Sequence, residues 1–503
     1  MTIEINDERH LPLQCRSHPL CRRPLSPIPL LLAAFAALLP HATPAHAQLE
    51  ERLPAPVARV LKAANVPSSA VAVYVQDADA RMPRASFNAA RPMNPASVMK
   101  LVTTYAALEL LGPAYTWKTE AYALGPMKEG ILEGDLALKG YGDPRLGFEQ
   151  FWLLLRQLRA RGLSEIRGDL VLDRSHFEAG NHDPARFDGE PLRPYNVGPD
   201  ALLLNFKSIR LGFVPDVEKK TVAIHAEPAP AQLDLVNLVK LGEGACGSAW
   251  YEGIRMDLAH TGAAARLILT GAYPAACGEK QRHVAVLDHP QFVAGVFRQL
   301  WAELGGKFSG GLREGAVPAG ARLLARGESP ALAEVVREIN KYSNNVMARQ
   351  LYLTLGAEAA KRPARAEDAE AAVRAWLVQK QLPMPELSIE NGAGLSRSDR
   401  IGAENLGRLL AAAFASPVMP EFIASLPLAG IDGTMKKRLN GNGVAGQAHV
   451  KTGYLDGVRA LAGYVLDRRG RRVVVVFLAN HPNAGATKAA QDALLACVYE
   501  RSC

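Results

Sequence analysis

The segment SVMKLVTTYAALELL, from Ser97 to Leu111, carries apolar residues at helical spacing and is followed directly by Gly112 and Pro113. Glycine and proline at that place are usual helix terminators. The turn-forming tripeptide NPA precedes the segment. The pattern therefore predicts a helix over residues 97–111 that opens at Ser97. Lys100, three residues later, is then on the same face of the helix as Ser97.

Strand-forming runs occur near both ends of the chain. They are residues 70–76, 448–454, 459–466 and 472–478. A DRRG turn separates the last two runs, as in a hairpin. Helical patterns at residues 49–64 and 485–499 accompany these strands. We therefore expect both ends of the chain to join one antiparallel sheet with helices packed on its faces, which is an α+β fold.

The middle of the chain, about residues 118–325, contains many short strand-like runs. With 503 residues the chain is too long for one ordinary core. We therefore predict a split main domain interrupted by one or two strand-rich inserted domains. The predicted boundaries are 48–117 and 326–503 for the main domain, 118–142 and 221–325 for inserted domain II, and 143–220 for inserted domain III.

Three short motifs bear residues that can carry out acyl transfer: Ser97-Val98-Met99-Lys100, Ser343-Asn344-Asn345 and Lys451-Thr452-Gly453. Each motif alone is a weak signal, because S-x-x-K arises by chance in a chain of this length. Their order and their local contexts together are a much stronger signal.

The spacing of Ser97 and Lys100 suits a nucleophile and its base. A lysine in a crowded, buried place is shifted toward its neutral amine, which can accept the proton of a serine hydroxyl. The start of a helix adds partial positive charge where an oxyanion would form. A serine at a helix start is also a common N-cap, and Ser97 could have both roles.

The residues of the other two motifs could also have ordinary structural roles. Ser343 and Asn345 precede an apolar helical run, where a polar turn or a helix cap is usual. Lys451 and Gly453 lie in a predicted strand, and a lysine also protects an edge strand from unwanted pairing. A glycine inside a strand often marks close approach by another backbone or a ligand. A lysine, a hydroxyl and a glycine in succession suit binding of a peptide carboxylate.

Taken together, these motifs resemble the class C low-molecular-mass penicillin-binding proteins, the D-alanyl-D-alanine carboxypeptidase/endopeptidase family. Further matching segments are GYGDP (140–144), GDLVLD (168–173), NGAGLSR (391–397), GTMKKR (433–438) and HVKTG (449–453). They extend over nearly all of residues 50–500. The sequence separation of 246 between Ser97 and Ser343 matches the large insertion of this family and argues against a compact β-lactamase.

The resemblance implies a penicillin-binding catalytic domain and a serine peptidase that cleaves D-Ala-D-Ala bonds and D-Ala–diamino acid cross-links of peptidoglycan. Ser97 is then the acylated nucleophile, Lys100 its base, and Ser343 a proton relay assisted by Lys451. Asn345 is expected to hold the substrate amide. The strand residues Thr452, Gly453 and Tyr454 are expected to bind the substrate, with the backbone N–H groups of Ser97 and Tyr454 as the oxyanion hole.

The resemblance also implies a subsite for the side chain of the peptide's diamino acid. In relatives an acidic residue and a tyrosine bind its free amino end. Asp188, Glu190 and Tyr195 lie in the corresponding loop here, for which a solvated surface loop is the alternative. Arg397 could meet a carboxylate. Arg349 departs from the family pattern, which often has an acidic residue at that place.

The first 47 residues resemble a secretory signal peptide. Arg22 and Arg23 precede an apolar run, and small residues in an A-x-A arrangement end at Ala47. The apolar run is shorter than a membrane span, so cleavage and a periplasmic location are expected rather than anchoring. Cys15 and Cys21 fall within this segment. The remaining cysteines permit disulfides, and the expected pairs are Cys246–Cys277 and Cys497–Cys503.

The sequence predicts peptidoglycan peptides as partners and β-lactams as covalent inhibitors. No metal or cofactor is expected, because P-loop, HExxH, Rossmann and zinc-ligand patterns are absent from the sequence. The net charge of +8 makes loose association with an anionic membrane surface plausible, but no nucleic-acid motif accompanies it. Two alternatives remain open: a wall-bound scaffold that binds without catalysis, and an esterase or β-lactamase on the same catalytic domain.

Overall fold

The computed structural model describes residues 53–503, except residues 179, 181, 262–263 and 361–362. The predicted signal peptide, residues 1–47, lies outside these residues. Within the part of the chain that is described, no helix is both long enough and apolar enough to cross a membrane.

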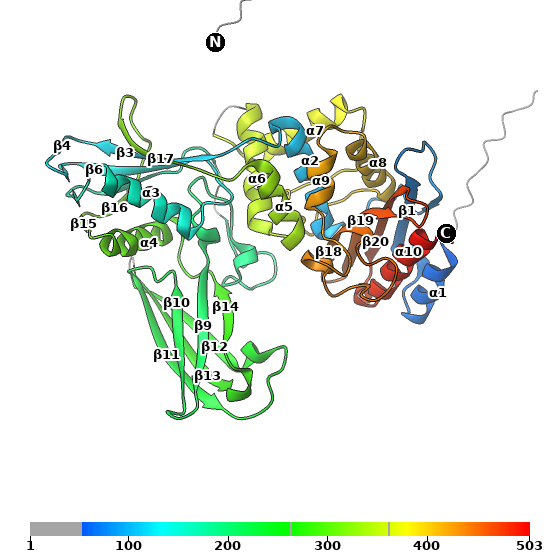
Figure 1. The fold of residues 1–503 in the computed structure, drawn as a ribbon, viewed down its shortest axis with the longest axis horizontal. Helices are drawn as coiled ribbons and strands as arrows, with labels where there is room; N and C mark the ends of the chain where they lie inside the picture. Colours follow the sequence, from blue (N-terminus) through cyan, green and yellow to red (C-terminus); the bar gives the residue numbers. More distant parts are fainter. Residues whose placement is uncertain (1–52, 179, 181, 262–263, 361–362) are drawn as a thin grey trace, which may run out of the picture. The chain divides into compact units, whose positions relative to one another are not determined.

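Both ends of the described chain enter one antiparallel sheet, as predicted (Figure 1). Its order is β18 (Ala448–Leu455), β19 (Val458–Leu466), β20 (Arg472–Asn480), β1 (Val71–Asp77) and β2 (Ala85–Phe87). β1 pairs with β20 along its whole length, from Val71 opposite Ala479 to Asp77 opposite Val473. β18 is therefore the edge strand on one side of this sheet, and this edge carries the Lys-Thr-Gly motif.

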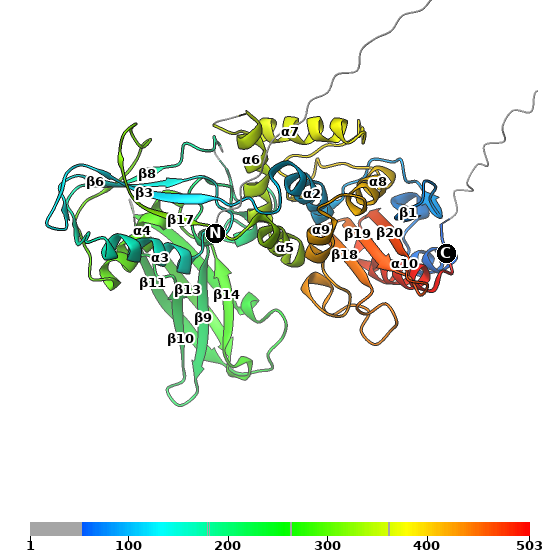
Figure 2. The same ribbon diagram turned by 45° about the horizontal axis from the view of Figure 1, so that its top comes forward.

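Helices cover both faces of this sheet (Figure 2). One face packs against α2 (Lys100–Leu111), α8 (Ala403–Phe414) and their neighbours α5 (Leu332–Tyr342), α6 (Asn345–Ala360), α7 (Ala366–Gln379) and α9 (Met419–Ser425). The other face packs against α1 (Ala55–Ala63) and α10 (Lys488–Glu500). Because side chains alternate across a strand, Val474 and Val476 enter the first core while Val473 and Val475 enter the second. This two-sided burial explains the unbroken apolar run of β20.

A second group of strands forms a mixed sheet in the order β16 (Leu312–Glu314), β8 (Leu170–Asp173), β6 (Asp135–Gly140), β3 (Lys118–Leu124) and β17 (Arg322–Glu328). A small sheet accompanies it: β15 (Lys307–Phe308), β7 (Glu165–Ile166), β5 (Ile131–Leu132) and β4 (Met127–Lys128). Helices α3 (Phe148–Ala160) and α4 (His289–Glu303) share a core with these strands.

The third group is a six-stranded sheet that one continuous stretch of the chain builds. Its order is β12 (Ile254–Thr261), β13 (Ala264–Pro274), β11 (Leu233–Gly242), β10 (Thr221–Glu227), β9 (Ile209–Asp216) and β14 (Lys280–Val284). The predicted internal borders of the inserted domains do not coincide with the limits of these sheets. The border at 142/143 separates β6 from β8, and the border at 220/221 separates β9 from β10, although the strands of each pair are hydrogen-bonded. Short strand runs reveal where strands lie, but they do not reveal which partner each strand pairs with.

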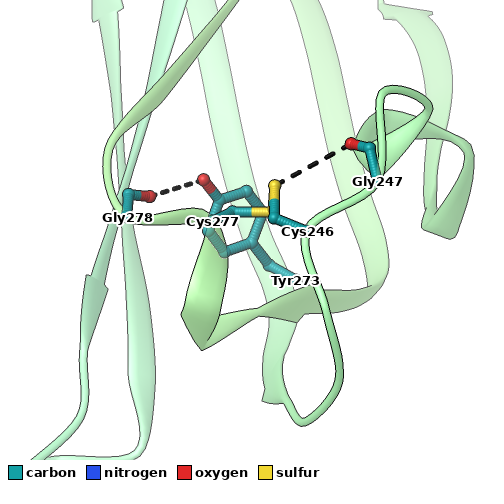
Figure 3. Close-up of a disulfide and its surroundings, with 5 residues drawn as sticks. All are labelled: Cys246, Gly247, Tyr273, Cys277 and Gly278. Carbon is teal, nitrogen blue, oxygen red and sulfur yellow. Dashed lines mark hydrogen bonds between the residues drawn. A yellow bond between two sulfur atoms is a disulfide. The ribbon is translucent and has the colours of Figure 1, made fainter.

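The two expected disulfides are present. Cys246 bonds to Cys277, and Cys497 bonds to Cys503. Figure 3 shows the first bond beside Tyr273, whose hydroxyl donates a hydrogen bond to the carbonyl oxygen of Gly278 at 2.7 Å. The Cys246–Cys277 disulfide joins the segment after β11 to the 3₁₀ turn that follows β13.

Candidate active site

Ser97 lies in a single 3₁₀ turn, Ala96–Met99, and the α-helix α2 begins only at Lys100. The predicted helix is thus present, but its first turn is tighter than an α-helix. Ala96 has a φ of +46°, a conformation that costs free energy for a residue with a side chain. The backbone N–H of Ala96 donates to Asn94 Oδ1 at 2.8 Å, which holds the chain in this conformation.

Two glycines allow other segments to approach this turn closely. A side chain at Gly394 would overlap the carbonyl group of Ala96, and one at Gly453 would come within 2.5 Å of the carbonyl oxygen of Pro95. Gly394 belongs to the NGAGLSR loop and Gly453 to the Lys-Thr-Gly strand. The nucleophile turn is therefore clamped between the loop and β18, which is a physical reason for glycine at both positions.

Lys100 is completely buried behind Ser97. Its Nζ donates hydrogen bonds to Ser97 Oγ at 3.0 Å, to Asn345 Oδ1 at 2.6 Å and to the carbonyl oxygen of Ala393. Burial, followed by the positive charge of Lys451, lowers the pKa of Lys100 well below its usual value. A lysine in this state can accept a proton from the hydroxyl it contacts.

Ser343 and Lys451 form a second serine–lysine pair. Ser343 ends α5 in the left-handed conformation, with a φ of +58°, and Asn345 begins α6 two residues later. Lys451, on β18, donates to Ser343 Oγ at 2.7 Å and is completely buried. Burial lowers the pKa of Lys451 to about 7.

The predicted residues meet in one cleft of about 440 Å³. Its lining consists of Ser97, Phe187, Asp188, Tyr195, Ser343, Asn345, Leu395, Arg397, Thr434, Thr452, Tyr454, Leu455 and Asp456. Among the predicted site residues, Lys100, Lys451 and Gly453 do not line the cleft. The two lysines lie behind the serines that they contact, and Gly453 packs against the nucleophile turn.

The predicted side-chain subsite is part of the same cleft. The Asp188 carboxylate accepts hydrogen bonds from the Tyr195 hydroxyl at 2.8 Å and from Asn196 Nδ2 at 2.7 Å. Burial acts to raise the pKa of Asp188, but these hydrogen bonds outweigh it and leave the pKa below its ordinary value. Asp188 is therefore an ionised carboxylate facing the cleft. Arg397 donates to the carbonyl oxygen of Asp456 at 3.0 Å and lies over the Phe187 ring.

Two residues beside the predicted set were not anticipated as site residues. Thr434 lines the cleft, and its hydroxyl accepts a hydrogen bond from Thr452 Oγ1 at 2.8 Å. Asp399 is completely buried near Lys100, and burial raises its pKa to about 6. The GTMKKR match was the available signal for Thr434. Asp399 follows the NGAGLSR loop, and its proximity to Lys100 arises only from folding.

A helix-flanked antiparallel sheet with Lys-Thr-Gly on its edge strand, opposite Ser-x-x-Lys and Ser-x-Asn, defines a penicillin-binding type of serine peptidase with extra domains. The comparisons with known proteins agree. The chain belongs to the D-Ala-D-Ala carboxypeptidase 3 (S13) family, whose profile matches residues 53–499. It is thus a serine-type D-Ala-D-Ala carboxypeptidase.

A curated relative is the D-alanyl-D-alanine carboxypeptidase of Actinomadura sp. (strain R39), which is 31% identical over 419 residues, covering 80% of this chain and 76% of the relative. Among solved structures, penicillin binding protein 4 (dacB) from Haemophilus influenzae is similar, with a TM-score of 0.73 and 24% identity. The alignment covers 88% of this chain and 99% of that one. The same protein complexed with a novel β-lactam gives a TM-score of 0.71, 23% identity and the same coverage. The solved structures support the fold.

Proposed function

We propose that the chain hydrolyses D-alanyl peptide bonds of peptidoglycan through an acyl-enzyme on Ser97. Both the terminal D-Ala-D-Ala bond and the D-Ala–diamino acid cross-link are substrates. The observation that carries this proposal is the hydrogen bond from buried Lys100 to Ser97 Oγ, within a cleft that also contains Ser343, Asn345 and Thr452.

In the acylation step, Ser97 Oγ attacks the carbonyl carbon of the scissile bond and its proton moves to the neutral amine of Lys100. The backbone N–H groups of Ser97 and Tyr454 stabilise the oxyanion. The bond between this carbon and the leaving nitrogen then breaks. Ser343, hydrogen-bonded to Lys451, donates its hydroxyl proton to the leaving amine. The proton that Lys100 took from Ser97 then moves to Ser343 Oγ, so Lys100 becomes neutral again.

In the second step, water hydrolyses the Ser97 ester. Water loses a proton to a base of the site, the ester bond breaks, and the proton returns to Ser97 Oγ, so the enzyme is regenerated. The peptide lies along the edge of β18 at Thr452 and Tyr454, which line the cleft, and there an extended chain can add to the sheet. Asn345 binds a substrate amide, and Thr452 binds the terminal carboxylate.

The cleft also supports proposals for inhibitors and for the peptide side chain. A β-lactam carries a reactive carbonyl and a carboxylate, so we expect it to acylate Ser97 and to be released slowly. The ionised Asp188, supported by Tyr195, binds the free amino end of the diamino acid, and Arg397 contributes positive charge at the rim. Peptidoglycan peptides and β-lactams are therefore the partners that we propose.

The periplasm is the location that we propose. The pattern of residues 1–47 and two disulfides support it, because disulfides form mainly in exported proteins. The net charge of +8 adds loose attraction to an anionic membrane surface, which salt would weaken.

A labelled penicillin tests the nucleophile. The native chain should acquire one covalent label, and peptide mapping should place it on Ser97. Ser97→Ala should not label, whereas Ser69→Ala, a change of an exposed serine outside the cleft, should label at the native rate. A native chain that does not label, or a label that persists in Ser97→Ala, would refute the proposal.

A further inference from the structure

Arg349 is a buried cation that the proposed mechanism does not use. It lies on α6, one helical turn after Asn345, and the residue is only 6% exposed. Its Nη1 donates to the carbonyl oxygen of Val197 at 2.8 Å. Burial lowers the pKa of Arg349 to about 10, so the guanidinium remains charged at neutral pH.

The other buried cations near the site have fuller sets of partners. Lys100 contacts three oxygen atoms, Lys451 contacts two, and Lys341 forms an ion pair with Asp432 at 2.6 Å. A guanidinium has five N–H donors, and the carbonyl of Val197 takes a hydrogen bond from one nitrogen. Within the described ranges, no carboxylate forms an ion pair with Arg349. Burying a charge costs free energy unless the charge is paired. The Arg349 guanidinium therefore has donors available for an anionic ligand.

Glu390 is the acidic residue whose charge acts on Arg349. Its attraction raises the pKa of Arg349, against the larger effect of burial. Glu390 is exposed, however, and its Oε2 accepts hydrogen bonds from the hydroxyls of Ser396 and Ser398. It therefore contributes to the field around the guanidinium without occupying its donors.

Arg349 lines a second cavity, of about 600 Å³, beside the active-site cleft. Phe187, Leu395 and Arg397 line both spaces and form the wall between them. The charged residues around this cavity, besides Arg349, are Asp183, Arg186, Glu367, Glu390 and Arg397. A ligand that extends from the cleft past this wall would meet the guanidinium.

One short segment links Arg349 to the proposed side-chain subsite. Asn196 lines the second cavity and donates to the Asp188 carboxylate, while the next residue, Val197, accepts from Arg349. Asp188 and Arg349 are thus held by consecutive residues, with opposite charges facing the two spaces. A peptide whose amino group is at Asp188 can therefore place a neighbouring carboxylate toward Arg349.

We propose that Arg349 binds a carboxylate of the peptide substrate and so sets specificity at a position away from the scissile bond. This inference rests on the proposed function. A guanidinium matches a carboxylate with two parallel hydrogen bonds, which an amide cannot reproduce. The carboxylate has two possible sources: the side chain of the diamino acid, or an acidic residue that precedes it in the peptide.

Three matched D-Ala-D-Ala peptides distinguish these sources. The first carries both carboxylates, the second has the diamino-acid side-chain carboxylate replaced by a carboxamide, and the third has that replacement at the preceding residue. In the native chain, one replacement should lower kcat/KM by about tenfold or more, as expected for a lost charge-assisted hydrogen bond. The affected peptide identifies the source.

The readout in the variants is the ratio of kcat/KM for the carboxylate and carboxamide peptides. Arg349→Met should bring this ratio close to one. Arg186→Met, which removes an exposed cation from the same cavity, should leave it within about twofold of the native ratio. A role in folding alone would lower turnover of all three peptides and leave their ratio unchanged.

Three results would overturn the inference: no preference in the native chain, a preference that survives Arg349→Met, or an equal loss in Arg186→Met. Penicillin labelling separates this failure from failure of the proposed function. If the native chain does not label, the peptidase proposal fails. If it labels but shows no carboxylate preference, only the role of Arg349 fails.

Discussion

Gly394 is the position where one methyl group tests the geometry of the nucleophile most directly. A Cβ added there would overlap the carbonyl group of Ala96 and lie 2.9 Å from the backbone nitrogen of Ser97. Gly394 also has a φ of +73°, which alanine adopts at a cost of about 1–2 kcal/mol. Because the obstacle is backbone, the loop or the Ser97 turn must move by roughly 1 Å to restore ordinary contact distances.

A displacement of about 1 Å at a reacting group can reduce a rate by about 100-fold. We therefore expect Gly394→Ala to slow acylation by a labelled penicillin by roughly two orders of magnitude. The same overlap should destabilise the fold by about 1–3 kcal/mol beyond the cost of the left-handed φ, which thermal unfolding would detect as a lower midpoint.

Gly441→Ala is the matched control for this change. Gly441 has a φ of +77°, and a Cβ there would meet no atom within 4 Å. The control therefore carries the same backbone cost without the overlap, and it should acylate at the native rate. If Gly394→Ala acylates within about threefold of Gly441→Ala and unfolds at the same temperature, the clamped-turn explanation is wrong.

Two further predictions concern pH dependence and the disulfide. Lys100 must be neutral to act as a base, so acylation falls as the pH drops below its pKa. Arg349 lowers that pKa and Asp399 raises it, so the acidic limb of the acylation profile should move to higher pH in Arg349→Met and to lower pH in Asp399→Asn. Shifts of the same sign would contradict this. Replacing Cys246 and Cys277 by alanine should cost about 3–4 kcal/mol from the 31-residue loop, seen as a lower thermal midpoint with unchanged penicillin labelling.

The elements of the main sheet could be predicted from the sequence because their signals are local. β20 is recognisable from its continuous apolar run, which burial on both faces requires. The helix after Ser97 is recognisable from the helical spacing of its apolar residues and from the Gly-Pro pair that ends it. The three motifs were predicted to meet, and the structure places Ser97, Ser343 and Thr452 in one cleft. That prediction came from the resemblance to a known family, because the spacing of two residues 246 positions apart does not indicate whether they are in contact.

What could not be predicted depends on contacts between distant residues. Strand pairing determines the borders within the inserted region, and nothing in a four-residue run such as β8 reveals that its neighbours are β6 and β16. The close approach of Gly394 and Gly453 to the 3₁₀ turn at Ser97 is likewise a contact between segments far apart in the sequence, and no local pattern predicts it. Asp399 has no local motif, and its burial near Lys100 arises from the folded loop.

The contacts also separate the chemistry of acylation from recognition of the peptide side chain. Ser97 and Lys100 are held by α6, β18 and the loop at Gly394, whereas Asp188 comes from the inserted region. Asp188→Asn keeps the shape but removes the charge. We expect this substitution to lower kcat/KM by about tenfold for a peptide whose diamino acid has a free amino end. For the same peptide with that amino group acetylated, we expect a much smaller loss. Benzylpenicillin has no free amino group, so its rate of acylation is the control for the chemistry at Ser97. Equal losses on both peptides would mean that Asp188 supports the cleft rather than binding the amine.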